Sequence, residues 1–218
     1  MRQRRKVGVI GSGMVGQTLA AGFHSHGDAV MVGTRTPAQL SAWQNGAGTG
    51  VAVGSVAEAA SFGELLVLAV KGASAQDVLY AAGAANLDGK LILDTTNPID
   101  TIPAVAGVLH FFTTLEDSLL ERLQRTVPKA RFVKAWNSVG AALMVDPRLP
   151  GGPPTMFICG NDPEARREAA AILDEFGWEV EDLGTAPAAR AVEPLCLLWC
   201  IPGFLANDWV HAFKMLRP

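Results

Sequence analysis

Short apolar runs alternate with longer Ala- and Leu-rich stretches over the first two-thirds of the chain. The apolar runs are nearly continuous rather than strictly alternating, which is typical of strands that helices cover on both faces. Strands are predicted at residues 7–10, 29–32, 65–70, 90–94 and 131–135, and helices at residues 16–26, 37–45, 73–85 and 118–127. Because strands and helices alternate, we expect an α/β fold with a doubly wound, mostly parallel sheet.

A Pro- and Gly-rich segment at residues 147–154 is the clearest interruption of this pattern. Clusters of this kind mark turns and linkers. Beyond it the pattern predicts a strand at residues 156–160, a helix at residues 163–176 that Asp162 caps, and a half-exposed strand at residues 178–183. We therefore expect a first domain over residues 1–150 and a small C-terminal α/β extension over residues 151–218.

The last apolar segment, residues 190–215, is predicted to be helical, with a kink or a split at Pro194 or Pro202. Its large side chains are Leu195, Leu198, Trp199, Leu205, Trp209, Val210 and Phe213. This is more apolar area than a terminal helix on a small domain usually hides, so we expect a homodimer. The alternative is that the segment folds back onto its own sheet. Its apolar run near residues 195–205 is too short to cross a bilayer, and no membrane contact is expected.

A glycine-rich motif follows the first predicted strand and opens the first helix. Gly11, Ser12, Gly13, Met14, Val15 and Gly16 form the pattern G-x-G-x-x-G. Gly11 permits a tight turn, Gly13 lets the backbone approach a pyrophosphate, and Gly16 lets the helix pack close to the strand. The amides of the helix N-terminus face the anion. In this context the motif predicts a Rossmann-type dinucleotide-binding domain.

The residues after the second predicted strand indicate which dinucleotide binds. An NAD site usually places Asp or Glu there to accept hydrogen bonds from the ribose, but this chain has Gly33, Thr34 and Arg35. The Arg35 guanidinium can pair with a phosphate, and the Thr34 hydroxyl can donate a hydrogen bond to it. An ordinary solvent-facing arginine in a turn is the alternative. The pattern favours NADP(H).

The carboxyl ends of the later strands carry few groups that could transfer a proton. In such a sheet the reactive end of a dinucleotide lies over these ends. They carry Ala69, Val70 and Lys71, then Asn97, then Trp136 and Asn137. Lys71 is a phosphate contact or a solvated turn residue, or else a proton donor, and the Trp136 ring either stacks on the cofactor or packs in the core. No catalytic residue is identified, and Asn97, Trp136 and Asn137 are the candidates for positioning an acceptor.

Composition and charge exclude several classes of protein. With 49% hydrophobic and 18% charged residues, the chain is too apolar to be disordered. The 18 basic residues against 21 acidic ones, a net charge of −3, disfavour a nucleic-acid partner. Cys159, Cys196 and Cys200 lack metal-ligand or disulfide spacing, so they are predicted to be reduced thiols of a cytoplasmic protein, and no metal site is predicted.

Taken together, these motifs resemble the NADPH-dependent reductases of coenzyme F420. The likeness covers nearly the whole chain and includes residues 9–16, 32–35, 94–98, 134–138, 159–165 and 190–195. The cytosolic oxidoreductase domain of six-transmembrane ferric reductases, which uses NADPH and a flavin, is similar at the same places. The resemblance implies that Thr34 and Arg35 hold the 2′-phosphate, residues 11–15 hold the pyrophosphate, and Val70 and Ala135 lie near the nicotinamide.

The activity that the resemblance implies is hydride transfer between NADP(H) and a flavin-like acceptor, either coenzyme F420 or a flavin such as FMN or FAD. Hydride exchange between two rings needs positioning more than proton transfer, which fits the sparse acids and bases. Two other functions stay open. One is an NADPH-dependent reductase of imines or small carbonyls related to pyrroline-5-carboxylate reductase, and the other is a non-catalytic NADP-binding redox sensor.

Overall fold

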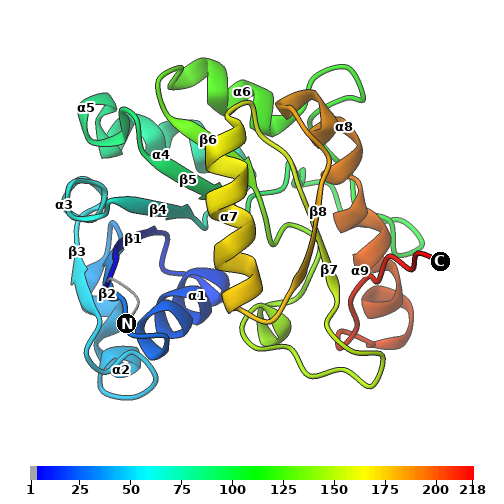
Figure 1. Ribbon diagram of the computed structural model, residues 1–218, viewed down its shortest axis with the longest axis horizontal. Coiled ribbons are helices and arrows are strands. Elements are labelled where there is room, and N and C mark those ends of the chain that lie inside the picture. The colour runs from blue at the N-terminus through cyan, green and yellow to red at the C-terminus, as the bar shows by residue number, and fades with distance from the viewer. Residues whose placement is uncertain (1–3) are drawn as a thin grey trace.

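A six-stranded sheet forms the centre of the fold, in the order β3-β2-β1-β4-β5-β6 (Figure 1). The computed structural model describes residues 4–218, so residues 1–3, which belong to the predicted first domain, lie outside it. The strands are β1 (Lys6–Ile10), β2 (Ala29–Gly33), β3 (Ala52–Gly54), β4 (Leu65–Leu68), β5 (Leu91–Asp94) and β6 (Arg131–Lys134). Every neighbouring pair is parallel, which confirms the predicted doubly wound α/β fold.

Helices cover both faces of this sheet. The helices of this part are α1 (Met14–Ser25), α2 (Ser41–Gln44), α3 (Val56–Phe62), α4 (Ala75–Ala82), α5 (Ala84–Leu87) and α6 (Leu119–Thr126). Leu19 and Phe23 of α1 belong to the buried cluster on one face, whereas Leu79 of α4 and Leu120 of α6 belong to the cluster on the other. The two clusters explain why the strands are apolar at nearly every position.

Strand β4 shows this division residue by residue. Leu65 and Val67 join the cluster that contains α1, and Leu66 and Leu68 join the cluster that contains α3, α4 and α6. Successive side chains of a strand point to opposite faces of the sheet, and both faces are covered, so all four side chains are buried. A continuous apolar run is therefore the direct consequence of helices on both sides.

The sequence pattern missed β3 and α3. Strand β3 is three residues long and ends in Gly54, so its apolar signal is weak. Helix α3 carries a signal that sequence reasoning could have used, since Ser55 and Glu58 form a capping box. The Ser55 side chain accepts a hydrogen bond from the Glu58 amide, and the Glu58 carboxylate accepts one from the Ser55 amide.

The last third of the chain forms a second, two-stranded parallel sheet from β7 (Thr155–Ile158) and β8 (Glu179–Asp182), with α7 (Pro163–Glu175) between them in sequence (Figure 1). All three elements agree with the predicted ones. Asp162 caps α7 as expected, because its side chain accepts a hydrogen bond from the Ala165 amide at 2.9 Å.

This second sheet packs against the first. An isolated antiparallel bridge joins Lys134 at the end of β6 to Cys159. Met156 and Phe176, from β7 and the residue after α7, belong to the same buried cluster as Val9 of β1. The core thus runs across residue 150, and the division into domains 1–150 and 151–218 stays a prediction.

The helical prediction for residues 190–215 is wrong beyond Ala206. The chain forms α8 (Ala189–Val192), splits at Pro194 as expected, and continues as α9 (Leu195–Ala206). Asn207, with φ of 54°, ends α9 in the left-handed conformation that asparagine tolerates. The remaining residues fold back along α9 and reach β7, where the Thr155 amide donates to the Phe213 carbonyl at 2.8 Å.

Aromatic contacts hold this returning tail. The Trp199 and His211 rings stack with centroids 5.1 Å apart, and the Trp199 indole donates to the His211 carbonyl at 2.9 Å. Trp209 lies over Gly203, where a Cβ atom would come within 2.2 Å of its ring. Of the apolar side chains singled out from the sequence, Trp199 is buried, Leu195 and Phe213 are partly buried, and Leu198, Leu205, Trp209 and Val210 are exposed.

The segment Ala186–Ala206, 21 residues long, passes the length and hydropathy test for a membrane span. It is longer than the apolar run considered from the sequence, because a helical turn and α8 precede α9. The test rests on length and composition only, and part of the segment belongs to the core. Ala189, Val192 and Glu193 are buried, and the Glu193 carboxylate pairs with Lys134 inside the protein.

Candidate dinucleotide and acceptor site

Two adjoining pockets follow the carboxyl edge of the main sheet. The β2-side pocket, of about 250 Å³, is lined by Ile10, Gly11, Ser12, Gly13, Gly33, Thr34, Arg35, Val56, Ala69, Val70, Lys71, Ser74 and Val78. The β5-side pocket, of about 520 Å³, is lined by Gly13, Met14, Val15, Ala69, Val70, Lys71, Gly72, Ala73, Thr95, Thr96, Asn97, Ile99, Asp100 and Thr101. Both include Gly13, Ala69, Val70 and Lys71, so the glycine loop lies where they meet.

The glycine loop has the geometry that a pyrophosphate needs. A Cβ atom on Gly11 would lie 2.0 Å from the Ala69 carbonyl oxygen, and one on Gly16 would lie 2.1 Å from the Gly11 carbonyl oxygen. Gly11 also has φ of 127°, which disfavours any side chain. Gly13 is different, since nothing lies within 4 Å of its Cβ position. Gly11 and Gly16 permit close packing, and Gly13 leaves its backbone open to the pocket at the start of α1.

Thr34 and Arg35 stand at the end of β2, in the β2-side pocket. The buried Thr34 hydroxyl lies 2.9 Å from the Ser12 hydroxyl, so the loops after β1 and β2 are joined directly. Arg35 is exposed, and its guanidinium has no ion-pair partner among residues 4–218. Lys71, also exposed, is likewise unpaired within the described chain. This half of the cleft therefore offers two cations to an anionic ligand, and its residues fit the adenosine 2′-phosphate and pyrophosphate of NADP(H).

In the β5-side pocket the polar side chains bond to the protein itself. The Thr95 hydroxyl donates to the Leu68 carbonyl at 3.0 Å, and the Thr96 hydroxyl donates to the Asp94 carboxylate at 2.7 Å. The Asn97 amide donates to the Asn137 carbonyl at 2.7 Å. These side chains are fixed by the fold, and the pocket presents mainly backbone and apolar surface to a ligand.

A buried ion-pair group lies beneath this pocket. The Lys134 ammonium, with a fully buried side chain, lies 2.7 Å from the Asp94 carboxylate and 3.0 Å from the Glu193 carboxylate, and it donates to the Thr96 carbonyl at 2.8 Å. Glu193 also accepts hydrogen bonds from the backbone amides of Leu119 and Leu120, at the start of α6. The group therefore ties β5, β6, α6 and the α8–α9 junction together.

The charged form of Lys134 is favoured although its side chain is buried. Burial disfavours the ammonium, but the carboxylates of Asp94 and Glu193 outweigh this effect and hold the pKa of Lys134 above its usual range. Sequence reasoning missed this group. The available signal was a lysine at the end of an apolar strand, which usually needs a buried partner.

Asn137 links the pocket to the C-terminal part without lining the pocket. Its side-chain amide donates to the Val192 carbonyl at 2.9 Å and to the Asn97 side-chain oxygen at 3.3 Å. Asn137 is buried, so it positions Asn97 from behind. Of the candidates for positioning an acceptor, only Asn97 lines the β5-side pocket.

Trp136 packs in the core and lines neither pocket. Its indole ring is 1% exposed and contacts the rings of Phe23 and Phe176, with centroids 6.4 Å and 5.4 Å away. The open choice between stacking on a cofactor and packing is thus answered by packing in this structure. Ala135, expected near the nicotinamide, is fully buried and also absent from both linings. Sequence reasoning missed Ile99, Asp100 and Thr101 as pocket residues because they lie in a long loop without a periodic pattern.

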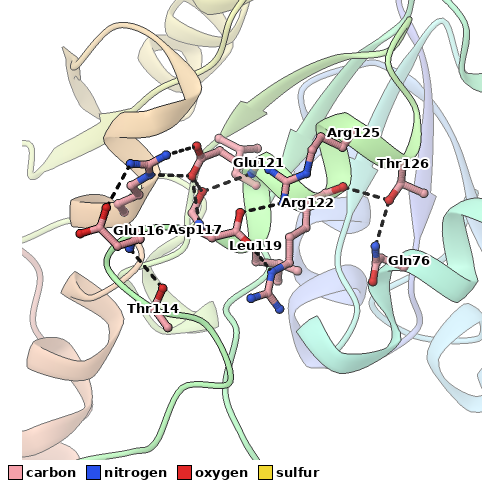
Figure 2. A network of polar contacts seen from close by, with 12 residues as sticks. Gln76, Thr114, Glu116, Asp117, Leu119, Glu121, Arg122, Arg125 and Thr126 are labelled. Carbon is pink, nitrogen blue, oxygen red and sulfur yellow. Dashed lines mark hydrogen bonds and ion pairs between the residues drawn. The ribbon is translucent and has the colours of Figure 1, made fainter.

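That loop joins β5 to α6 and is held at its far end by ion pairs (Figure 2). Asp117 pairs with Arg122 at 2.8 Å and with Arg125 at 2.7 Å, and Arg190 of α8 reaches Glu121 at 2.7 Å. The Arg190 guanidinium is the main reason why the pKa of Glu121 falls to about 2, although burial opposes it. The network anchors α6 and the end of the loop to α8.

Within residues 4–218 the three cysteine thiols are buried core groups. Burial raises the pKa of the Cys159 thiol to about 12, so it is a neutral core group. Cys196 and Cys200 are buried beside Trp199. Across residues 4–218, no group of three His, Cys, Asp or Glu side chains could hold a metal ion.

The strand order, the glycine loop and the cleft define a Rossmann-type dinucleotide-binding protein. The sequence model of the family described as "NADP oxidoreductase coenzyme F420-dependent" matches residues 6–98. A candidate F420-dependent NADP reductase from Arthrobacter sp. FB24 is 36% identical, with a TM-score of 0.91, and the likeness covers 99% of this chain and 100% of that one. The chain belongs to this family and is an NADP-dependent oxidoreductase.

Two further likenesses are less complete. The metalloreductase STEAP3 of Rattus norvegicus is 30% identical over 213 residues, which is 94% of this chain. This chain spans only 40% of the length of STEAP3. A reductive aminase from Aspergillus terreus, solved with NADPH and ethyl levulinate, is 19% identical over 94% of this chain and 63% of its own, with a TM-score of 0.65. At that identity the likeness concerns the fold alone.

Proposed function

We propose that the protein transfers a hydride between NADP(H) and a flavin-like acceptor, either coenzyme F420 or a flavin such as FMN or FAD. The observation that carries the proposal is the position of the β5-side pocket. It adjoins the glycine loop and lies over the carboxyl ends of β4 and β5, where the reactive end of a dinucleotide is expected. Family membership supports the same activity.

Different residues along the cleft bind different parts of the cofactor. Thr34 and Arg35 bind the 2′-phosphate, and the backbone of residues 11–15 holds the pyrophosphate. Ala69 and Val70, which line both pockets, position the cofactor toward the β5-side pocket, where Met14 and Ile99 provide apolar surface. Lys71, where the pockets meet, contacts phosphate.

When bound in the cleft, NADPH would supply a hydride, which the acceptor ring would take together with one solvent proton, leaving NADP⁺. The protein has to exclude water and hold the reacting atoms about 3–3.5 Å apart. The internally bonded Thr95, Thr96 and Asn97 suit that task, since their side chains do not compete for the ligand. Asn137 keeps Asn97 in place from behind.

The direct test measures NADPH oxidation at saturating NADPH with free flavin, FMN and coenzyme F420 as separate acceptors. The reaction is monitored by the absorbance of NADPH. Reduction of at least one of the three is the expected result. Turnover with none of them, in a protein that still binds NADPH, would contradict the proposal.

A second candidate is reduction of imines or small carbonyls, and Asp100 favours it. Its carboxylate lines the β5-side pocket and could pair with the iminium cation, the form of an imine that already carries its proton and accepts the hydride. A pyrroline or small ketone that is reduced while flavins are not would select this candidate. NADPH binding without turnover of any acceptor would leave the redox-sensor alternative.

We also propose a cytoplasmic location and a homodimer. The buried free thiols of Cys159, Cys196 and Cys200 support the location. Exposed apolar side chains on α9 and the returning tail, among them Leu198, Leu205 and Val210, support self-association. A monomeric mass at micromolar concentration would contradict the dimer.

A further inference from the structure

A hairpin arm, residues 98–112, forms one wall of the β5-side pocket. It belongs to the loop between β5 and α6, and its base, residues 99–101, lines the pocket. An antiparallel bridge between Ile99 and Phe111 joins the two limbs of the arm at this base. The position of the pocket wall therefore depends on how the whole arm is held.

The tip of the arm rests on α9 (Figure 1). Ala106 and Gly107, with φ of 51° and 81°, form the two-residue turn at this tip. A Cβ atom on Gly107 would lie 3.2 Å from the Leu205 side chain, so the tip and the end of α9 lie side by side. Nearer the base, Phe111 packs against the α9 cluster that contains Trp199. The arm thus connects the pocket to α9.

The arm and α9 together expose an apolar surface without charged side chains. Residues 101–109 and residues 194–207 contain no Asp, Glu, Lys or Arg. The arm–α9 surface consists of large side chains that are each between 42% and 67% exposed, namely Ile102, Val105, Val108, Leu198, Phe204 and Leu205. Trp209 of the returning tail continues it, since its ring meets the Phe204 ring edge-on with centroids 5.4 Å apart.

The size and the chemistry of the arm–α9 surface fit a second copy of this chain. Six half-exposed large side chains present apolar area on the order of several hundred Å², and the largest apolar patch of a typical monomer is about 300–600 Å². A stable interface covers about 800 Å² per partner. Strand edges that stay in water usually carry charged residues, which this arm lacks beyond its base. An uncharged apolar surface can pair with itself across a two-fold axis, because each copy offers the other the same side chains.

We infer that two copies pair through the arm–α9 surface, and that this contact holds the arm in place as the wall of the β5-side pocket. The inference rests on the proposed function and makes the homodimer a part of the acceptor site. A partner that covers Val105 and Leu205 fixes the tip against α9, and the base at residues 99–101 is fixed with it. The β2-side pocket has no arm residue among its described lining residues. Acceptor turnover should therefore depend on pairing, and NADPH binding should not.

The test compares Val105→Lys and Leu205→Lys with the unchanged protein. Both side chains are exposed, at 65% and 67%, so each single copy should still fold, and NADPH binding verifies this. A lysine buried in the interface without a counter-charge should raise the dissociation constant of the dimer about 100-fold or more. Tyr80→Lys is the matched control, because Tyr80 is 68% exposed on α4, which lies away from α9 (Figure 1).

Four measurements are made on each protein. Sedimentation gives the mass at micromolar concentration, and calorimetric titration gives the dissociation constant of NADPH. Amide hydrogen exchange of residues 98–112 reports on the arm without any acceptor, and NADPH oxidation with FMN and with coenzyme F420 gives the turnover. We expect dimers for the unchanged protein and Tyr80→Lys, and monomers for the two arm–α9 variants. In these monomers the arm should exchange several-fold faster and kcat/KM for the acceptor should fall about tenfold, with unchanged NADPH binding.

A monomeric unchanged protein, arm–α9 variants that stay dimeric, or an equal loss of the dimer in Tyr80→Lys would overturn the inference. So would monomeric variants whose arm exchange and acceptor turnover equal those of the dimer, and in that case the hydride-transfer function stands. If neither FMN nor coenzyme F420 is reduced by any of the proteins, but the monomeric variants show the faster-exchanging arm, the proposed function falls while the pairing and its hold on the arm stand.

Discussion

The two halves of the cleft are built in opposite ways. On the β2 side, Arg35 and Lys71 are exposed and have no partner among the described residues, so their charges are available to a ligand. On the β5 side, Thr95, Thr96 and Asn97 bond to the protein, and the Lys134 ion-pair group lies beneath them. In the proposed function, the β2 side binds the charged groups of the cofactor directly, and the β5 side provides a pocket of fixed shape.

Substitutions on the two sides of the cleft should therefore have different effects. Removing a group from the β2 side should weaken ligand binding and leave the fold intact, because that group contacts little else. Removing a group from beneath the β5 side should destabilise the fold, because its partners are buried and would be left unpaired. The predictions below test this division, beginning with the largest expected effect.

Lys134→Met should destabilise the protein by about 3–5 kcal/mol, because it leaves the carboxylates of Asp94 and Glu193 buried without a counter-charge. The measurement is the free energy of unfolding in urea. Lys129→Met is the matched control, since it breaks an exposed ion pair with Asp88 at 3.2 Å and should cost less than about 1 kcal/mol. Equal effects of the two substitutions would contradict a structural role for the buried group.

Arg35→Ala should raise the dissociation constant of NADPH about 10- to 150-fold, because a charge-assisted phosphate contact contributes about 1.5–3 kcal/mol. Binding of NADH, which lacks the 2′-phosphate, should hardly change, and neither should the unfolding midpoint. Calorimetric titration of both cofactors makes the comparison. Equal weakening of NADPH and NADH would remove Arg35 from the 2′-phosphate site.

The same division separates what the sequence could predict from what it could not. The glycine loop (residues 11–16) and the pair Thr34 and Arg35 are each short local motifs, and their proposed roles depend on backbone shape or an exposed charge, so a local pattern can predict them. The Lys134 group joins residues 94, 134 and 193, and no local pattern connects these positions. The buried strands were predictable for a related reason, since burial on both faces leaves a continuous apolar run.

The C-terminal segment shows a further limit. Its apolar composition predicts burial equally well as one long helix or as a helix with a returning tail. The structure has the second arrangement because Trp199 and Trp209 gain contacts with His211 and Gly203 that a continuous helix would not allow. Ile99 and Asp100 line the pocket from a loop, and a loop gives no periodic signal, so the sequence did not predict them as pocket residues.

Asn137→Ala should lower acceptor turnover and spare NADPH affinity. It removes the hydrogen bonds to the Val192 carbonyl and to Asn97, so Asn97 loses its support at the pocket wall. Only the bond to Asn97 reaches the pocket wall, and a net loss of about 1 kcal/mol for it corresponds to roughly a fivefold fall in kcat/KM. Asn161→Ala, which removes a comparable bond to the Ala186 amide outside both pockets, is the control. A similar fall in both variants would show that Asn137 acts only through stability.

The smallest effect concerns the ion pair between Arg190 and Glu121, which anchors the far end of the loop that carries Asp100. Arg190 holds the pKa of Glu121 near 2 in the folded protein, against an ordinary value of 4.5. For a carboxyl with a lowered folded-state pKa, the stabilisation is present above the ordinary value and is lost as the pH falls toward about 2. Arg190→Gln should therefore lower the free energy of unfolding slightly at pH 7, because Arg190 is partly exposed and solvent screens its charge. The difference from the unchanged protein should shrink between pH 4.5 and pH 2, where Glu121 takes up its proton in both proteins. Urea unfolding across this pH range measures the difference, and a constant offset between the two proteins would show that Arg190 stabilises α8 by packing rather than by its charge.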